Sequence, residues 1–252
     1  MKERAFKGTS EAFSFETMPN DLKQFLLGSL LGDGCYTLNQ KRSVNCHLII
    51  SHSTKQEEYI KYKFDLLNKY NLVSSFRRRT TIDKRFKIPE YTEIHLKSKQ
   101  NPIFTYIRLK SYKQSKKNIN MEIIRNLDEF GLAIWYMDDG YVTKNSCIFS
   151  TCSFPIEQQK KLAKFLENRF ELHFTVGKND NSLYLKSKDF PKLVALISSY
   201  IIPSMQYKLI PYSKRVLYKS DKLLEHPNGT ISRQATQGCV EGSETNSIPL
   251  EQ

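Results

Sequence analysis

The chain has 252 residues, which is enough for one large domain or two small ones with a substantial core. Its content of 39% hydrophobic and 26% charged residues excludes a wholly disordered protein, and no apolar run is long enough for a membrane-spanning helix. The net charge is +13, because 39 Lys and Arg outnumber 26 Asp and Glu. A polyanion is therefore the expected partner, and nucleic acid is the commonest one.

The first half of the chain predicts helix, two strands, helix, two strands and helix. The first helix starts after Pro19, and its apolar residues recur at helical spacing until Gly32 and Gly34 end it. A short alternating segment at 45–51 follows, and then a second helix over 56–69. Residues 73–82 and 92–98 are predicted to pair as strands, and a closing helix begins near Pro102.

The second half repeats this order. Asp128 begins a helix that Gly140 ends, residues 147–152 alternate, and a helix is predicted over 156–170. Strand candidates at 174–177 and 182–186 precede a closing helix near Pro191. The predicted fold class is α+β, with two αββαββα units whose antiparallel sheets are each covered by helices on one face.

Three matching segments support a duplication. The matched pairs, in chain order, are residues 26–34 (LLGSLLGDG) with 132–140 (LAIWYMDDG), 66–72 with 166–172, and 96–99 with 185–188. Their offsets are 106, 100 and 89 positions, which indicates shorter loops in the second copy. We predict a first half over 19–118 and a second over 119–225, flanked by a loose N-terminal arm (1–18) and a flexible tail (226–252).

Each of the two predicted motif helices ends in an aspartate followed by glycine, Asp33-Gly34 and Asp139-Gly140. A carboxylate is unfavourable at the negative end of a helix dipole, and two neighbouring carboxylates raise each other's pKa. A divalent cation removes both costs, and Mg²⁺ prefers carboxylate, water and phosphate oxygens. If the helices pack about a pseudo-twofold axis, Asp33 and Asp139 form a site for metal-assisted phosphodiester hydrolysis. The simpler interpretation, in which Asp33 is a turn residue, does not explain the second copy.

These two segments resemble the paired motifs of the LAGLIDADG homing endonucleases, in their monomeric two-motif form, and the resemblance extends over about residues 20–215. It implies two halves related by a pseudo-twofold axis, with saddle-shaped sheets that face the DNA major groove. It also implies that Asp33 and Asp139 bind two or three Mg²⁺ ions, which Mn²⁺ can replace. The implied product is a staggered double-strand break.

The same resemblance bears on the contact between the motif helices. Gly28 and Gly32 are four residues apart, a spacing that permits close packing, and Ala133 is the expected small residue on the second helix. Ile134 and Asp138 stand where the family often has small residues, which predicts a lopsided contact. Asp138 is expected to be a hydrogen-bonded interface or capping acid, with a third metal ligand as the alternative.

One lysine in each active site is implied by the resemblance. Lys208 and Lys117 are the candidates, with Lys116 as the alternative to Lys117. Such a lysine would polarise the water network or neutralise the pentavalent phosphate. The alternative role for each is a solvated or phosphate-contacting surface lysine.

Alternation along the strands predicts a DNA-binding face, because successive side chains point to opposite sides of a sheet. Phe76 and Ile82 are expected to face the helices. Polar and charged side chains on the other face suit base edges in the major groove. The predicted DNA-binding residues are Ser75, Arg77, Arg79, Thr81, Glu93, His95 and Lys97 in the first half, and Lys178, Tyr184 and Lys186 in the second.

The function predicted from these features is site-specific double-strand DNA cleavage by a monomer. An RNA-binding intron maturase on the same scaffold, without cleavage, is the alternative, and both acids favour cleavage. The expected partners are the DNA target site and the protein's own intron RNA, and no membrane is expected. The start lacks the apolar core of a secretory signal, and the excess of Lys, Asn, Ile, Tyr and Phe fits an AT-rich genome. We expect an intracellular protein encoded in a mitochondrion or chloroplast, with the bacterial cytoplasm as the alternative.

Overall fold

The computed structural model describes residues 15–38, 43–82 and 90–210. Its first half contains α1 (Asn20–Leu31), β1 (Cys35–Thr37), β2 (His47–Ser53), α2 (Glu57–Lys69), β3 (Val73–Ile82), β4 (Glu90–Ser98) and α3 (Pro102–Ser111). Its second half contains α5 (Glu129–Asp139), β7 (Gly140–Val142), β8 (Cys147–Phe149), α6 (Ile156–Phe170), β9 (Phe174–Val176), β10 (Leu183–Leu185) and α7 (Phe190–Ile197). The hairpin β5 (Tyr112–Lys113) and β6 (Lys116–Lys117) and the short α4 (Met121–Ile124) connect them.

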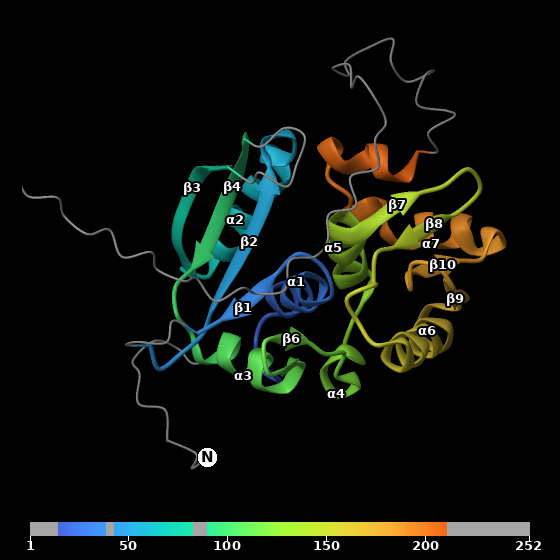
Figure 1. The fold of residues 1–252 in the computed structure, drawn as a ribbon, viewed down its shortest axis with the longest axis horizontal. Helices are drawn as coiled ribbons and strands as arrows, with labels where there is room; N and C mark the ends of the chain where they lie inside the picture. The colour runs from blue at the N-terminus through green and yellow to red at the C-terminus, as the bar shows by residue number, and fades with distance from the viewer. Residues whose placement is uncertain (1–14, 39–42, 83–89, 211–252) are drawn as a thin grey trace, which may run out of the picture.

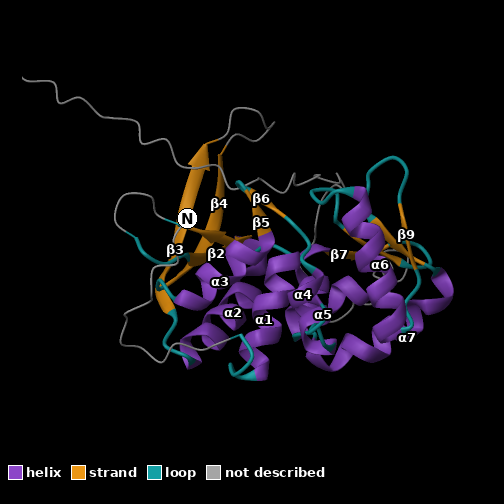
Figure 2. Cartoon of the chain, turned by 90° about the horizontal axis from the view of Figure 1, so that it is seen from below, coloured by secondary structure: helices purple, strands orange, loops and turns teal. Residues whose placement is uncertain are grey.

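The two sheets have the same topology. The first has the strand order β1-β2-β4-β3 and the second β7-β8-β10-β9, and all neighbouring strands are antiparallel. Figure 2 shows the helices as a layer beneath the strands. The predicted α+β fold with two αββαββα units is therefore confirmed.

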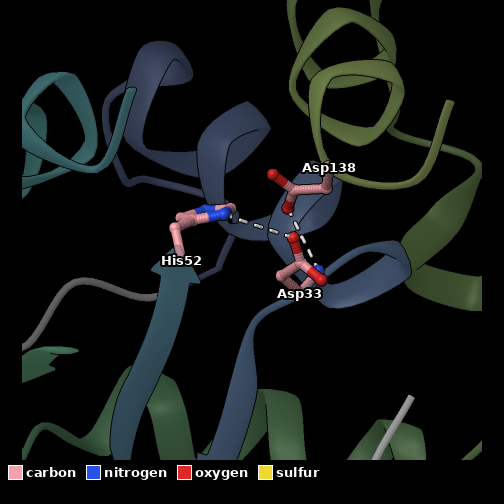
Figure 3. A group of neighbouring side chains, drawn as sticks. All are labelled: Asp33, His52 and Asp138. Atoms are coloured by element: carbon pink, nitrogen blue, oxygen red, sulfur yellow. Dashed lines mark hydrogen bonds and ion pairs between the residues drawn. The ribbon is translucent and has the colours of Figure 1, made fainter. Parts of the chain in front are cut away.

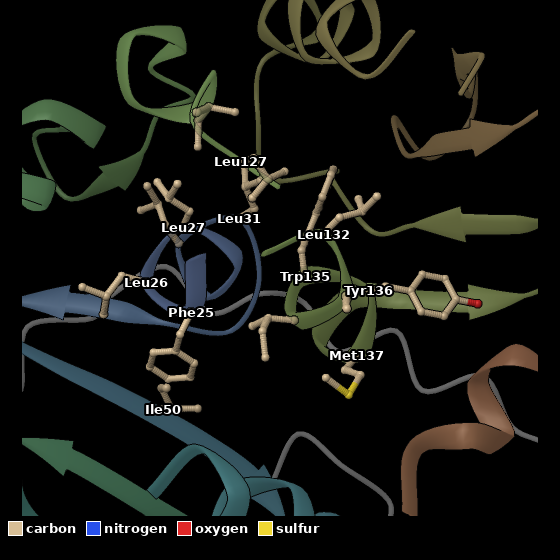
Figure 4. Packing of buried hydrophobic residues seen from close by; sticks show 14 of the residues in the cluster. Phe25, Leu26, Leu27, Leu31, Ile50, Leu127, Leu132, Trp135, Tyr136 and Met137 are labelled. Carbon is tan, nitrogen blue, oxygen red and sulfur yellow. The ribbon is translucent and has the colours of Figure 1, made fainter. Parts of the chain in front are cut away.

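The motif helices α1 and α5 lie side by side at the centre of the molecule (Figure 1). Phe25 of α1 points toward Ile50 of β2, whereas Tyr136 of α5 points away from α1 (Figure 4). Trp135 and Tyr136 are fully buried, and both rings pack against Phe149 of the second sheet. Each motif helix thus fills the core of its own half while contacting the other helix.

Polar contacts join the N-terminal ends of the two helices. Asp128 caps α5 by accepting a hydrogen bond from the backbone nitrogen of Gly131, and Asn20 donates to the same carboxylate over 2.9 Å. Gln24 donates to the carbonyl oxygen of Asn126 and accepts from the backbone nitrogen of Asp128. These bonds fix α1 relative to the start of α5.

Little of the predicted N-terminal arm and none of the predicted tail are among the described residues. Phe15 and Met18, at the end of the predicted arm, are buried, and the Phe15 ring stacks on Tyr106 at 5.6 Å. The predicted tail and residues 211–225 lie outside the described residues. Among the described helices, none has both the length and the apolar character needed to cross a bilayer.

Candidate active site and nucleic-acid interface

The motif helices approach closely enough to require glycine at position 28 of α1 and at position 32, directly after it. A Cβ atom at Gly28 would lie 2.5 Å from the carbonyl oxygen of Gly131, and one at Gly32 would lie 2.5 Å from the Cβ atom of Asp138. Non-bonded carbon contacts are normally about 3.5–4.0 Å, so any side chain here would force the helices apart. Both glycines predicted at the interface therefore lie in it.

The contact on α5 comes from larger groups than the family pattern suggested. Ala133 is fully buried, but the atoms that approach Gly28 and Gly32 most closely belong to Gly131, Ile134 and Asp138. Because Gly28 provides the space that Ile134 occupies, the larger side chain does not prevent close packing. The contact is lopsided, as the sequence predicts.

This packing places Asp33 and Asp139 at neighbouring helix ends. Asp33 lies in the turn after α1, which the backbone nitrogen of Gly34 closes by donating to the carbonyl oxygen of Ser29 over 2.7 Å. Asp139 is the last residue of α5. Burial raises the pKa of Asp139, and the charge of Asp33 adds to that shift, so the first-half carboxylate acts on the second-half one.

Asp138 has a separate role, because protein donors occupy both of its carboxylate oxygens. Its Oδ1 accepts hydrogen bonds from Lys63 Nζ at 2.5 Å and from the Tyr59 hydroxyl at 2.7 Å. Its Oδ2 accepts from the backbone nitrogen of Asp33 at 3.1 Å. Burial raises the pKa of Asp138, but Lys63, His52 and these hydrogen bonds hold it below its usual value. This geometry agrees with an interface acid that fixes the turn carrying Asp33.

His52 and Lys63 complete a buried cluster beside Asp33. Lys63 Nζ lies 3.0 Å from His52 Nε2, and His52 Nδ1 lies 3.7 Å from the Asp33 carboxylate (Figure 3). Burial and the Lys63 charge lower the pKa of His52 to about 3, so the ring is neutral near pH 7. The cluster therefore places one buried cation and one neutral imidazole at the first-half side of the site.

The two predicted active-site lysines reach the ends of the motif helices. Lys117 Nζ donates to the carbonyl oxygen of Gly32. Lys208 Nζ donates to the carbonyl oxygens of Met137 at 2.5 Å and Asp138 at 2.9 Å. Cations are favourable at helix C-termini, and these two also lie near the acids. Burial lowers the pKa of both lysines, although the three motif carboxylates oppose that shift.

Burial and neighbouring charges both act on the pKa values of the two acids. Burial raises the pKa of Asp33 to about 6, and Asp138 adds to the shift. Burial raises the pKa of Asp139 well above its usual range, and Asp33 adds to that shift. Lys117 and Lys208 oppose both shifts without cancelling them. A cation between the acids would lower both pKa values.

The carboxylate oxygens of Asp33 and Asp139 have the chemistry that a hard divalent cation prefers. One ligand atom each from Asp33, His52 and Asp138 lie within 4.8 Å of one another, but Asp138 and His52 are already engaged by Lys63. Within the part of the chain that the structure describes, no hydrogen bond reaches the Asp139 carboxylate, and Asp33 keeps 30% of its side-chain surface exposed. Their oxygens are therefore the donors left for an ion such as Mg²⁺.

The first sheet brings its predicted DNA-binding residues to one face. In the β3–β4 register, Ser75 is opposite Lys97, Arg77 is opposite His95, and Arg79 is opposite Glu93. Directly opposed residues of antiparallel strands point to the same side of a sheet. Arg77 and Arg79 are exposed, whereas His95 is tied to Ser51 at 3.0 Å and to Glu93 at 3.2 Å. Thr81 is in the strand as predicted, but its side chain lies outside the described set.

The other face of β3 matches the prediction only in part. Phe76 packs on Phe64 of α2 with ring centroids 5.1 Å apart. Ile82 was expected to face the helices, and this is wrong, because it is 68% exposed. Arg78, which precedes Ile82 in β3, pairs with Glu57, the first residue of α2. The last residues of β3 therefore extend past the end of α2, so this helix does not cover Ile82.

In the second half, only one of the three predicted DNA-binding residues is within a strand. Tyr184 is opposite Ile148 and Thr175, and its hydroxyl donates to Asp180 over 2.8 Å. Lys178 and Lys186 are exposed, but they follow β9 and β10 and are not part of them. Strand alternation therefore does not determine which way they point.

Lys63, His52 and Tyr59 have no role among the functional residues predicted from sequence. One signal was available, because Lys63 falls on the apolar stripe of α2 with Tyr59, Ile60 and Leu67. A lysine on a buried stripe needs a carboxylate partner, since an unpaired buried charge is strongly unfavourable. That partner comes from the other half of the chain, and its identity depends on the packing of α1 against α5.

Comparisons with known proteins agree with this fold. A family model described as the LAGLIDADG DNA endonuclease family matches residues 23–193. The chain is 36% identical to the intron-encoded endonuclease ai4 of Dictyostelium discoideum over 111 residues, which cover 42% of this chain and 70% of that protein. It is 28% identical to the cytochrome b mRNA maturase bI2 of Saccharomyces cerevisiae, over 76% of this chain and 48% of that protein. The chain thus spans about half the length of the yeast relative.

A solved structure shows the same fold. The homing endonuclease I-WcaI, solved bound to its DNA recognition sequence, superposes with a TM-score of 0.68 at 24% sequence identity. The match covers 77% of this chain and 87% of that one.

Proposed function

Because the chain belongs to the LAGLIDADG DNA endonuclease family, we propose that it is a site-specific double-strand DNA endonuclease of the intron-homing type. It acts as a monomer and uses Mg²⁺. The observation that carries the proposal is the position of Asp33 and Asp139 at adjoining ends of two closely packed helices, with raised pKa values and a lysine beside each end.

Each half supplies one acid and one lysine to the reaction. Asp33 and Asp139 would hold the divalent cations, which would supply the lowered pKa of water and the stabilisation of the leaving oxygen. Lys117 and Lys208 are fixed by helix carbonyl oxygens, so their positive charges are pre-positioned for the phosphate in the transition state. One active site per half gives one cut in each DNA strand.

The sheets bind the DNA on either side of these active sites. Arg77 and Arg79 extend from an exposed strand face, where they suit base edges in the major groove. Lys97 lies on the same face, and Lys178 and Lys186 add positive charge in the second half. The net charge of +13 favours the encounter with DNA, and that contribution weakens as salt rises.

Intron RNA binding is the second candidate function. It is supported by the similarity to a protein named as a cytochrome b mRNA maturase. The same relative supports an organelle-encoded origin. A maturase without cleavage would need the basic surface but neither acid, so the retained Asp33 and Asp139 favour the nuclease.

The proposal is tested on DNA that carries the uninterrupted host-gene sequence. Wild-type protein should cut both strands with Mg²⁺ and neither strand with EDTA. Asp33→Asn and Asp139→Asn should bind this DNA within about threefold of wild type, because the binding sheets are unchanged, yet lose double-strand cleavage by at least about 100-fold. Undiminished cutting by either variant contradicts the metal-ligand assignment, and full maturase activity with no cutting by wild type favours the second candidate.

A further inference from the structure

His52 is a buried group that the proposed reaction does not use. It is at the end of β2, 5% exposed, with its ring against Tyr59 at 5.0 Å. Its Nε2 is 3.0 Å from Lys63 Nζ, and its Nδ1 is 3.1 Å from Gln56 Oε1 and 3.7 Å from Asp33 Oδ2. Each ring nitrogen therefore has a defined partner, and one of them faces an active-site acid.

These partners fix where the ring proton lies. Lys63 forms a buried ion pair with Asp138, and its ammonium group can only donate hydrogen bonds. Nε2 must then be the acceptor, so the proton is on Nδ1 and is donated to Gln56 Oε1, with Asp33 Oδ2 3.7 Å away. Because both nitrogens are engaged, His52 is placed as a fixed polar side chain beside Asp33, beyond hydrogen-bond distance, rather than as a metal ligand. Gln56 in turn donates to the Tyr207 hydroxyl, which fixes its amide.

In the part of the second half that the structure describes, no histidine takes this place. Cys152 lies 100 positions after His52 and is exposed, and Gln159 lies 100 positions after Tyr59. Gln159 is bonded to Thr151 and to the carbonyl oxygen of Phe154, within its own half. Among the described residues, no histidine forms an ion pair or hydrogen bond with Asp139. The two acids, although related by the repeat, are therefore supported differently.

We propose that His52, held by Lys63 and Gln56, is a positioning residue for Asp33 and acts on only one of the two strand cleavages. This inference rests on the proposed function and adds a functional difference between its two active sites. A carboxylate that is held in place by a neighbouring fixed side chain binds its metal ion in the productive geometry more often. Loss of this neighbour should therefore slow one strand and leave the other unchanged.

Two substitutions separate the roles of the ring nitrogens. His52→Asn places an amide nitrogen where Nδ1 lies and can keep the contact with Asp33, whereas His52→Gln places its amide near Nε2 and loses that contact. The assay is single-turnover cleavage of a duplex with a different dye on each strand, over a range of Mg²⁺ concentrations. We expect His52→Gln to slow one strand about 10- to 100-fold at low Mg²⁺, to require more Mg²⁺ for that strand, and to accumulate a nicked duplex. His52→Asn should retain most of the wild-type rate.

Cys152→Ser, at an exposed position after β8 of the second half, is the control and should leave both strands unchanged. If neither His52 variant folds, Gln56→Leu removes the acceptor that holds the ring and should slow the same strand by a smaller factor. An unchanged strand ratio in folded variants, or equal slowing of both strands, overturns the inference. Failure of the wild-type protein to cut either strand overturns the proposed function instead, so the two failures are distinguishable.

Discussion

The two halves share a topology but differ in how much sheet they present. In the first half, β3 and β4 are ten and nine residues long, and their opposed residues form a continuous charged face. In the second half, each strand has three residues, and the predicted lysines are outside the strands. The two halves therefore share the order of their elements, whereas the lengths of their sheets differ.

The interior shows a similar asymmetry. Lys63 of α2 pairs with Asp138 of α5, so a buried cation from the first half neutralises an acid from the second. In α6, the buried residues include Gln159 and no lysine. The helix pair thus brings the motif acids together, and among the described residues a buried ion pair reinforces it on the first-half side alone.

The largest expected effect of this asymmetry is on stability. Lys63→Met should lower the free energy of unfolding by about 3–5 kcal/mol, because it leaves the Asp138 carboxylate buried without its partner. The exposed Lys161 of α6 is the matched control, and Lys161→Met should change stability by less than about 0.5 kcal/mol. The free energy of unfolding of both variants is measured by urea denaturation. Equal losses would mean that the buried ion pair contributes no more to stability than the exposed lysine.

A smaller effect is expected in DNA binding. Arg77→Ala should cost about 1–3 kcal/mol of binding free energy and relax sequence preference at one base pair, because its strand face suits direct base contacts. Lys178→Ala should weaken binding uniformly across sequences. It should also reduce the slope of log affinity against log salt concentration by about one, as expected for the loss of one phosphate contact. Competition binding with single-base variants of the target, at two salt concentrations, separates these outcomes. A change in base preference in Lys178→Ala, with none in Arg77→Ala, would contradict the roles given to these two residues.

The smallest expected effect concerns pH and uses protein without divalent cations. The pKa of Asp33 rises from 3.8 to about 6 on folding, so the folded protein binds this proton more tightly than the unfolded chain. Its contribution to stability therefore increases as pH falls from about 7 to about 4. Asp33→Asn should be more stable than wild type at pH 7, and the difference should shrink toward pH 4. Thermal unfolding across this range provides the measurement, and a constant difference would contradict the raised pKa.

Local patterns were sufficient to predict the fold. The repeat offsets, the glycines after each motif acid and strand alternation predicted the element order and which residues of β3 and β4 share a face. The same patterns predicted that Gly28 and Gly32 lie between the helices. These features depend on residues close in sequence or on a similarity between two copies.

The details of the site depend on contacts between the halves. The role of Lys63 follows from the approach of Asp138, 75 positions away, and no local pattern specifies that distance. The prediction for Ile82 was wrong because strand alternation indicates which face of the sheet a side chain is on, but not where the helix covering that face, α2, ends. Metal binding by Asp33 and Asp139 and the catalytic roles of Lys117 and Lys208 remain predictions.

Anomalous diffraction from crystals of the protein bound to its target DNA in Mn²⁺ would test the shared metal centre most directly. We predict manganese peaks bound by the carboxylates of Asp33 and Asp139, with Asp138 remaining on Lys63. Manganese bound elsewhere, with these two carboxylates in unconnected surroundings, would contradict the account.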